Sequence, residues 1–237
     1  MQVISEGFKK TVQIASNGVA LTGDWVMPAS RKTLGIILFA HGRGSSRHST
    51  RNKAVARYLE SRGMGTLLLD LLTPEEEGFD EVTAQLRFDI PLLAHRLCDT
   101  THWLAEQPEA HRLPLGYFGA STGAAAALMA AAELRSQIAA VVSRGGRPDL
   151  AGEALPYVIS PTLLLVGERD VVVGDLNRDA LDRLHCVKEL VIIPGASHLF
   201  EEQGTLEQVA EKSADWFSEY FVVWDESLAN MKGGALR

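Results

Sequence analysis

The sequence predicts an α/β fold with a mostly parallel central sheet and helices on both faces. Short runs of apolar residues recur along the chain, and segments with apolar residues at helical spacing lie between them. Runs that are apolar throughout are typical of strands buried on both faces of a parallel sheet. Alternation of such strands with helices is typical of a layered α/β architecture. Buried strands are expected at residues 35–40, 65–69, 115–118, 138–142, 161–166 and 189–193.

The remaining segments are expected to flank this sheet. Residues 10–27 alternate around an Asn-Gly pair, which predicts an antiparallel hairpin. Residues 70–81 are polar and acidic, and we expect a solvated surface loop there. Residues 82–107 are expected to be mostly helical, with Pro91 in a first turn or at a kink.

Length and composition limit the classes of protein to consider. The chain has 237 residues, of which 46% are hydrophobic and 22% charged, as in ordinary globular proteins. A net charge of −7 argues against a nucleic-acid-binding surface. No apolar run approaches the roughly 20 residues of a membrane span, the first ten residues lack the apolar core of a secretion signal, and two cysteines form no disulfide or metal pattern.

These observations predict how the chain is organised. We expect a cytoplasmic protein that forms one domain over residues 1–237, with a loose tail after about residue 225 and no large cap domain. We expect neither nucleic acid nor a membrane among its partners, and either a monomer or a homodimer.

The turn after the third predicted buried strand carries the strongest motif. Residues 119–123 read Gly-Ala-Ser-Thr-Gly and lead into an alanine-rich, helix-forming segment. In this context a G-x-S-x-G pattern indicates a nucleophile elbow, which holds its serine in strained backbone above the sheet. Glycine is expected at both ends because side chains there would collide. Ser121 is therefore a candidate nucleophile, and a chance glycine-rich turn is the alternative.

An acid and a histidine follow the last two predicted strands. Asp170 comes after one strand and His198 after the next, in the order that α/β-hydrolases use. The carboxyl ends of parallel strands meet at one edge, so these residues are expected to lie near Ser121. A histidine can take the serine proton, and a carboxylate can orient the histidine. Alternatively, Asp170 could cap a helix, Glu168 could be the acid, and His198 could be an ordinary loop residue.

Two backbone N–H groups are expected to form an oxyanion hole. One belongs to Thr122, directly after the nucleophile, and the other to Arg43 in the loop that follows the first buried strand. His41 is expected to support this loop, because His198 already fills the role of base. The constellation implies no metal and no organic cofactor.

Residues 41–48, 70–77 and 143–149 are similar to segments of bacterial proteins grouped as dienelactone-hydrolase-like. The chain resembles the α/β-hydrolase superfamily over nearly its whole length, which implies the α/β-hydrolase fold and a small-molecule ester substrate. Dienelactone hydrolases proper use a cysteine nucleophile, whereas this elbow carries Ser121. Serine suits ordinary carboxylic esters, so carboxylesterase activity is expected.

The resemblance also directs attention to arginines. Dienelactone is anionic, so its hydrolases need cationic contacts, and guanidinium groups match carboxylate geometry. The arginines that could supply them are Arg43, Arg47, Arg51, Arg144 and Arg147. Of these, Arg47 and Arg144 are the candidate substrate contacts, and salt bridges that hold active-site loops are the alternative role. Three other functions stay open at this point. They are hydrolysis of dienelactone or another lactone, hydrolysis of organophosphate triesters on the same triad, and a non-catalytic binding role.

Overall fold

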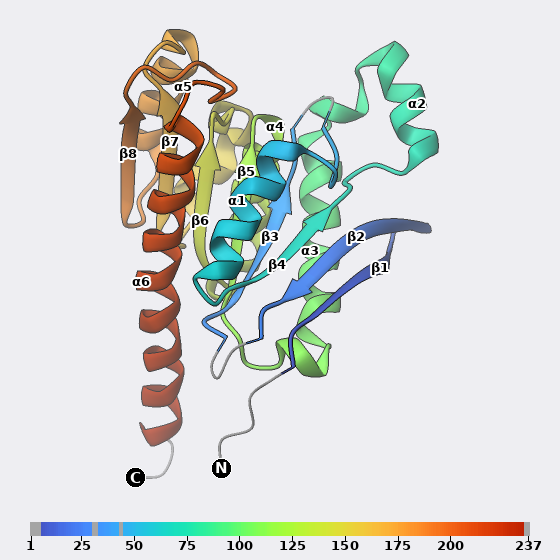
Figure 1. The fold of residues 1–237 in the computed structure, drawn as a ribbon, viewed down its shortest axis with the longest axis vertical. Helices are drawn as coiled ribbons and strands as arrows, with labels where there is room; N and C mark the ends of the chain where they lie inside the picture. The colour runs from blue at the N-terminus through green and yellow to red at the C-terminus, as the bar shows by residue number, and fades with distance from the viewer. Residues whose placement is uncertain (1–5, 30–32, 43–44, 235–237) are drawn as a thin grey trace.

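A computed structural model describes residues 6–29, 33–42 and 45–234, with side chains described up to residue 227. One eight-stranded sheet, in the order β1-β2-β4-β3-β5-β6-β7-β8, forms its centre (Figure 1). The strands are β1 Phe8–Ser16, β2 Val19–Met27, β3 Ile36–Ala40, β4 Gly65–Leu69, β5 Leu115–Ala120, β6 Ile138–Arg144, β7 Thr162–Gly167 and β8 Lys188–Ile193. From β4 to β8 all neighbouring strands are parallel, and only β2 pairs antiparallel, with β1 and β4. The predicted fold class is confirmed.

Helices cover both faces of the sheet (Figure 1). The α-helices are α1 Thr50–Ser61, α2 Pro74–Thr83, α3 Ile90–Ala105, α4 Thr122–Leu134, α5 Val171–Arg183 and α6 Thr205–Gly234. Short 3₁₀ segments are η1 Leu86–Phe88, η2 Pro108–Ala110, η3 Arg135–Gln137 and η4 Pro148–Tyr157. Apolar side chains of α1 and α6 pack against one face, and those of α3, α4 and α5 pack against the other.

Alternation of side chains along the central strands fills both apolar layers. Leu38 and Tyr117 point to the layer under α3 and α4, while Phe39 and Phe118 point to the layer under α1 and α6. The two phenylalanine rings lie 4.8 Å apart between their centroids. The Tyr117 hydroxyl meets a partner inside the core, 2.6 Å from the Thr101 hydroxyl. Strands β3 and β5 are therefore fixed from both sides.

The prediction of a solvated loop at residues 70–81 is wrong, because most of this segment forms α2. The Thr73 hydroxyl accepts a hydrogen bond from the Glu76 N–H at 3.2 Å, and the Glu76 carboxylate accepts one from the Thr73 N–H at 2.8 Å. This capping box, with Pro74 in the first turn, starts the helix. The Glu76 carboxylate also forms a double ion pair with Arg96 of α3, at 2.6 and 2.7 Å. The acidic run therefore serves as a capped helix start that is tied to the body.

Two other predicted segments can be compared with the structure. Residues 82–107 are mostly helical as predicted, although Ala84 ends α2 in a left-handed conformation and α3 begins at Ile90, with Pro91 in its first turn. The loose tail expected after about residue 225 is wrong, since α6 continues to Gly234. The Trp224 indole N–H donates to a carbonyl of η3 at 3.1 Å and holds this part of the helix against the body. The predicted hairpin at residues 10–27 is confirmed.

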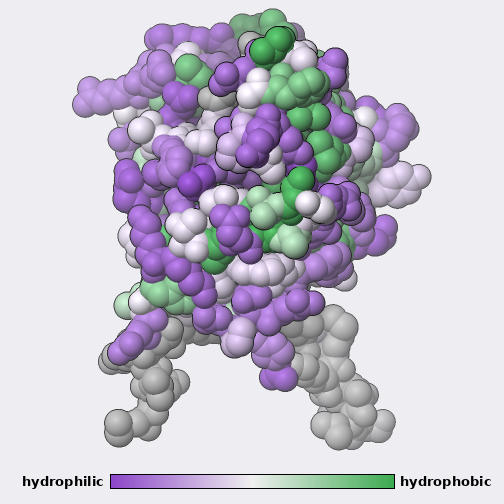
Figure 2. All heavy atoms as spheres, turned by 90° about the vertical axis from the view of Figure 1, so that its right-hand side faces the viewer, coloured by the Kyte–Doolittle hydropathy of each residue, from purple (hydrophilic) through white to green (hydrophobic). Residues whose placement is uncertain are grey.

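The face that carries α2 is mainly hydrophilic, with a narrower band of hydrophobic side chains (Figure 2). Phe79 and Val82 of α2 and Phe88 of η1 are among the exposed large apolar residues. Within the described residues, no helix combines the length and the apolar composition that crossing a membrane requires. No large cap stands between β6 and β7, where the described chain forms only the short segment η4.

Candidate active site

Four loops meet at the edge of the sheet where the parallel strands end. β3 leads to His41, β5 to Ser121, β7 to Asp170 and β8 to His198. Because these strands are parallel neighbours, or one strand apart, their loops lie side by side at this edge (Figure 1). The structure therefore brings together the residues that the sequence predicts to act together.

The turn at Ser121 has the geometry of a nucleophile elbow. Its backbone has φ 52° and ψ −124°, a strained conformation for a residue with a side chain, and α4 begins at the next residue. Both flanking glycines are required, as expected. However, a side chain at either position would collide mainly with backbone atoms of other residues, and not with a side chain at the other position. A Cβ at Gly119 would lie 2.4 Å from the Ala124 Cα, and one at Gly123 would lie 2.3 Å from the Ala40 carbonyl oxygen. The turn is thus wedged between the end of β3 and its own helix.

Gly42 is a further part of the elbow that sequence reasoning missed. A Cβ there would lie 2.6 Å from the Ser121 Cβ and 2.7 Å from the Ala120 carbonyl oxygen. Only glycine lets the loop after β3 come this close to the serine. The signal in the sequence is a glycine two residues after the end of a buried strand, but its partner Ser121 is far away along the chain.

Asp170 and His198 form a direct hydrogen bond. His198 Nδ1 lies 2.6 Å from Asp170 Oδ2. Asp170 occupies the N-cap position of α5, but its side chain makes no capping bond there and turns to the histidine instead. The competing acid, Glu168, accepts the Gly195 N–H at 2.7 Å and so holds the turn before His198. The geometry favours Asp170 over Glu168 as the partner of the imidazole.

Ser121 and His198 line one cavity of about 400 Å³. Among the described residues, no hydrogen bond joins these two side chains, and the contact of His198 is with Asp170. The described residues that line this cavity are Gly42, Ser45, Arg51, Phe88, Ala120, Ser121, Thr122, Arg144, Gly145, Arg147, Val173, His198 and Leu199.

The Thr122 N–H lies at the start of α4, where the first amides have no partner within the helix. Thr122 also lines the cavity, so this amide and the helix N-terminus are placed to stabilise a negative charge beside Ser121. The second predicted oxyanion donor, Arg43, lies outside the described residues.

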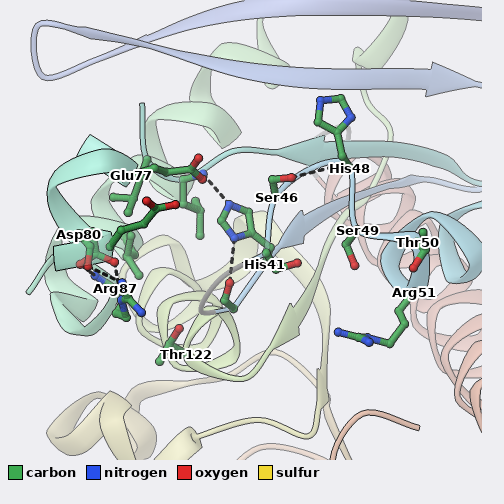
Figure 3. A pocket seen from close by; sticks show the side chains of 16 residues that line it. His41, Ser46, His48, Ser49, Thr50, Arg51, Glu77, Asp80, Arg87 and Thr122 are labelled. Atoms are coloured by element: carbon green, nitrogen blue, oxygen red, sulfur yellow. Dashed lines mark hydrogen bonds and ion pairs between the residues drawn. The ribbon is translucent and has the colours of Figure 1, made fainter. Parts of the chain in front are cut away.

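A second cavity, of about 450 Å³, adjoins the first and shares Gly42, Ser45, Arg51 and Thr122 with it. The side chains of Glu77 and Asp80 lie on one side of His41, and the hydroxyl groups of Ser49 and Thr50 lie on the other (Figure 3). Leu71, Leu72 and Leu93 add apolar surface. Thr122 therefore lines both cavities.

His41 is buried between the elbow and this second cavity. The Leu71 N–H donates to His41 Nε2 at 3.1 Å, so Nδ1 carries the proton and points to the Gly42 carbonyl oxygen, also at 3.1 Å (Figure 3). Burial lowers the pKa of His41 and outweighs the opposing effects of the Gly42 carbonyl and the Asp70 carboxylate. A neutral imidazole with both nitrogens occupied fits the expected supporting role.

The two arginines predicted as substrate contacts lie in different places. Arg47 is ion-paired with Asp70, and its Nε lies 3.6 Å from an oxygen of Asp24, so it ties the loop after β3 to β2 and β4. It is not among the described residues that line either cavity. We therefore assign Arg47 the alternative role, an ion pair that holds an active-site loop. Arg144 lines the cavity that contains Ser121 and His198.

Known proteins resemble the chain in sequence and in structure, although no protein-family model matches it. It is 56% identical over 209 residues to proteins from two strains of Mycobacterium tuberculosis that are named "Putative phosphoribosyl transferase". The match covers 88% of this chain but 46% of those proteins, so the chain spans about half the length of the curated relatives it matches.

Solved structures show the same fold. Est1E from Butyrivibrio proteoclasticus has a TM-score of 0.72 at 16% identity, and covers 90% of this chain and 98% of its own. A dienelactone hydrolase from Anabaena variabilis is 53% identical with a TM-score of 0.87, and the match covers 91% of this chain and 99% of that one. The chain therefore belongs to the dienelactone-hydrolase-like family of α/β-hydrolases.

Proposed function

We propose that this α/β-hydrolase cleaves carboxylic esters through an acyl-enzyme on Ser121. The observation that supports this most is the strained elbow at Ser121, which lines one cavity with a histidine held at 2.6 Å by Asp170. A serine hydroxyl becomes a useful nucleophile only when a neighbouring base takes its proton.

In the first half of the reaction, His198 Nε2 takes the proton of Ser121 Oγ as that oxygen attacks the ester carbonyl carbon. The negative oxygen that forms is stabilised by the Thr122 N–H and the N-terminus of α4. When the tetrahedral intermediate collapses, the bond to the alcohol oxygen breaks and His198 gives its proton to the departing alcohol. Asp170 holds the imidazole in the required tautomer and stabilises its charged form.

In the second half, a water molecule takes the place of the alcohol beside His198. His198 accepts one proton from the water as the water oxygen attacks the acyl carbon. Collapse of the second intermediate breaks the bond to Ser121 Oγ, which regains its proton from His198. The products are one carboxylic acid and one alcohol for each water consumed.

Other substrates could reach the same serine. A lactone would follow the same steps, with the alcohol remaining attached to the acid product. An organophosphate triester would phosphorylate Ser121, and such an adduct is slow to hydrolyse, so inhibition is expected in place of turnover. The transferase name belongs to relatives about twice the length of this chain, and the elbow described here favours acyl transfer to water.

The test is hydrolysis of p-nitrophenyl esters from acetate to octanoate by the wild type and by Ser121→Ala. We expect turnover over one range of chain lengths, and loss of that turnover in Ser121→Ala. Unchanged turnover in the variant would exclude Ser121 as the nucleophile. Absence of turnover of every ester in both proteins would favour a lactone substrate or the non-catalytic role.

A further inference from the structure

An apolar groove lies at the end of the molecule opposite the candidate active site. It has a volume of about 250 Å³, and it is formed by the starts of β6 and β7 and by residues 220–227 of α6. Its walls include Ile159, Pro161, Val223 and Trp224. The active-site loops follow the other ends of the parallel strands, so a molecule bound in this groove would leave the candidate active site open.

The apolar side chains of this groove are exposed. Ile159 is 44% exposed and Val223 is 53% exposed. Val187, which is 58% exposed, extends the apolar surface, because its carbonyl oxygen accepts the first N–H of β7 at 2.9 Å. Tyr220 and Trp224 add aromatic rings to the groove, and aromatic residues are enriched at protein interfaces. A cluster of this kind is typical of a surface that another protein covers.

Acidic side chains lie beside the groove. Burial raises the pKa of Tyr220, and the nearby carboxylates of Glu219 and Glu189 raise it further. Residues 205–227 of α6 include six acidic side chains and one basic side chain. Two copies of the chain that met at this groove would bring two such helices together, and like charges opposed across an interface weaken binding. The charges therefore favour a different partner, one with basic side chains around its own apolar surface.

The relatives from Mycobacterium tuberculosis contain a part with no match in this chain. The match covers 88% of this chain but 46% of those proteins, so more than half of each relative lies outside it. The hydrolase from Anabaena variabilis is matched over 99% of its own chain, so a hydrolase domain of this type folds without the additional part. The additional part is therefore expected to rest on the surface of the hydrolase domain and not to complete its core.

Both ends of the described chain lie at the end of the molecule that carries the groove. β1 begins and α6 ends there, away from the active-site loops (Figure 1). Phe8 of β1 and Asp225 of α6 line a neighbouring groove together with Pro114, which directly precedes β5. A further domain joined to either end of the hydrolase domain would therefore begin close to the apolar groove.

We infer that the groove between α6 and the starts of β6 and β7 is the docking site for a second protein domain, equivalent to the part of the Mycobacterium tuberculosis relatives that lies outside the match. This partner places apolar side chains against Ile159 and Val223, and basic side chains near Glu189 and Glu219. Docking here is independent of the reaction at Ser121, because the two sites lie at opposite ends of the strands.

The experiment uses an intact Mycobacterium tuberculosis relative with a specific protease site inserted between its two parts, so that both parts fold before they are separated. The additional part is immobilised through a tag, and after cleavage its own hydrolase domain is washed away at high salt. This chain is then passed over the immobilised part. We expect saturable binding that weakens as the salt concentration rises, because charges contribute to the contact. Absence of binding at low salt would overturn the inference.

Val223→Arg should raise the Kd at least about tenfold, because it places a charge where the apolar surface of the partner packs. Val222→Arg is the matched control, since it adds the same charge to the same helix at an exposed valine that is not among the described residues lining the groove. It should bind as the wild type does. Replacement of Glu189 and Glu219 by glutamine should weaken binding and reduce its salt dependence. Binding of Val223→Arg as tight as that of the wild type would overturn the inference.

Sedimentation of this chain alone tests a second copy as the occupant. We expect Val223→Arg to leave the mass of the particle unchanged. A dimer that Val223→Arg dissociates and Val222→Arg does not would show that a second copy fills the groove, and it would overturn the inference. Because all of these measurements report binding, their outcomes do not depend on whether Ser121 cleaves an ester.

Discussion

His198 Nδ1 lies 2.6 Å from Asp170 Oδ2. Asp170 is the N-cap residue of α5, but its side chain makes no hydrogen bond to the first turn of that helix. The carboxylate is mostly buried, with 14% of its side chain exposed, whereas the imidazole is 42% exposed. The fixed member of the pair is therefore the acid, and the histidine is held by it at the mouth of the cavity. Orientation of His198 should depend on this one contact.

Asp170→Asn should lower kcat on the order of 10⁴-fold, because an amide can hold the wrong tautomer of the imidazole. Glu168→Gln is the matched control, since Glu168 is the other acid after β7 and accepts a backbone N–H instead. Steady-state kinetics on a p-nitrophenyl ester measures both variants. A larger loss in Glu168→Gln than in Asp170→Asn would reverse the assignment of the acid.

Gly42→Ala should strongly reduce ester hydrolysis, because the new methyl group would lie 2.6 Å from the Ser121 Cβ and push the elbow out of place. Gly78→Ala is the control, since a Cβ at that position in α2 meets nothing within 4 Å. Replacing a helical glycine there should raise stability by about 1 kcal/mol. Activity and thermal unfolding are measured for both variants. Wild-type activity in Gly42→Ala would refute the close approach of the two loops.

Thr73→Ala should destabilise α2 by about 1 kcal/mol, because it removes the side chain that accepts the Glu76 N–H. Hydrogen exchange of the α2 amides measures this local stability. If these amides exchange at the wild-type rate, the capping box does not hold the helix.

Stability of α2 should also depend on pH. Hydrogen bonds from Arg96 lower the pKa of Glu76 below its usual 4.5, despite the opposing effect of burial. The pair therefore contributes fully above about pH 4.5, and its contribution is lost as the pH falls through the folded-state pKa. Glu76→Gln should remove this acid dependence of hydrogen exchange in α2, whereas Glu75→Gln, an exposed change in the same turn, should retain it.

His41 should make the protein less stable in mild acid. Burial holds the pKa of His41 in the folded protein below its usual value of 6.5. At a pH between the folded-state pKa and 6.5, the unfolded chain therefore binds a proton that the folded protein does not. The free energy of unfolding should therefore fall as the pH drops below 6.5. Urea unfolding at pH 7.5 and 5.5 should show a smaller fall in His41→Gln than in the wild type. The control is His111→Gln, a change at an exposed histidine, which should leave the fall as it is in the wild type. An equal fall in His41→Gln and the wild type would mean that the folded protein takes up the His41 proton as readily as the unfolded chain.

Local patterns predicted much of this architecture. Strands such as β5 are apolar throughout because both of their faces are covered, so their sequences mark them directly. The elbow and the positions of Asp170 and His198 follow from short motifs at strand ends. The acidic run of α2 favours a solvated loop when only its charge is considered, although Thr73 and Glu76 stand at the spacing of a capping box.

Other features depend on partners that are distant in the sequence. The sequence could not predict that Arg47 is ion-paired whereas Arg144 lines the cavity, because both are arginines beside predicted active-site loops. Arg47 meets Asp70 and Asp24 only after β2 and β4 have paired. Within the part of the chain that the structure describes, Arg144 is buried near Arg51 and has no carboxylate partner. Likewise, the need for glycine at position 42 appears only once the loop after β3 touches the elbow.

The most direct test of the central claim is to trap the acyl-enzyme. The wild type is mixed with p-nitrophenyl butyrate, quenched with acid within milliseconds, digested and mapped by mass spectrometry. We expect a butyryl group on Ser121, which should accumulate further in His198→Ala if that variant is acylated at all, because deacylation needs the same base. A butyryl group on another residue, or steady turnover with no acyl group on Ser121 at any quench time, would contradict the mechanism.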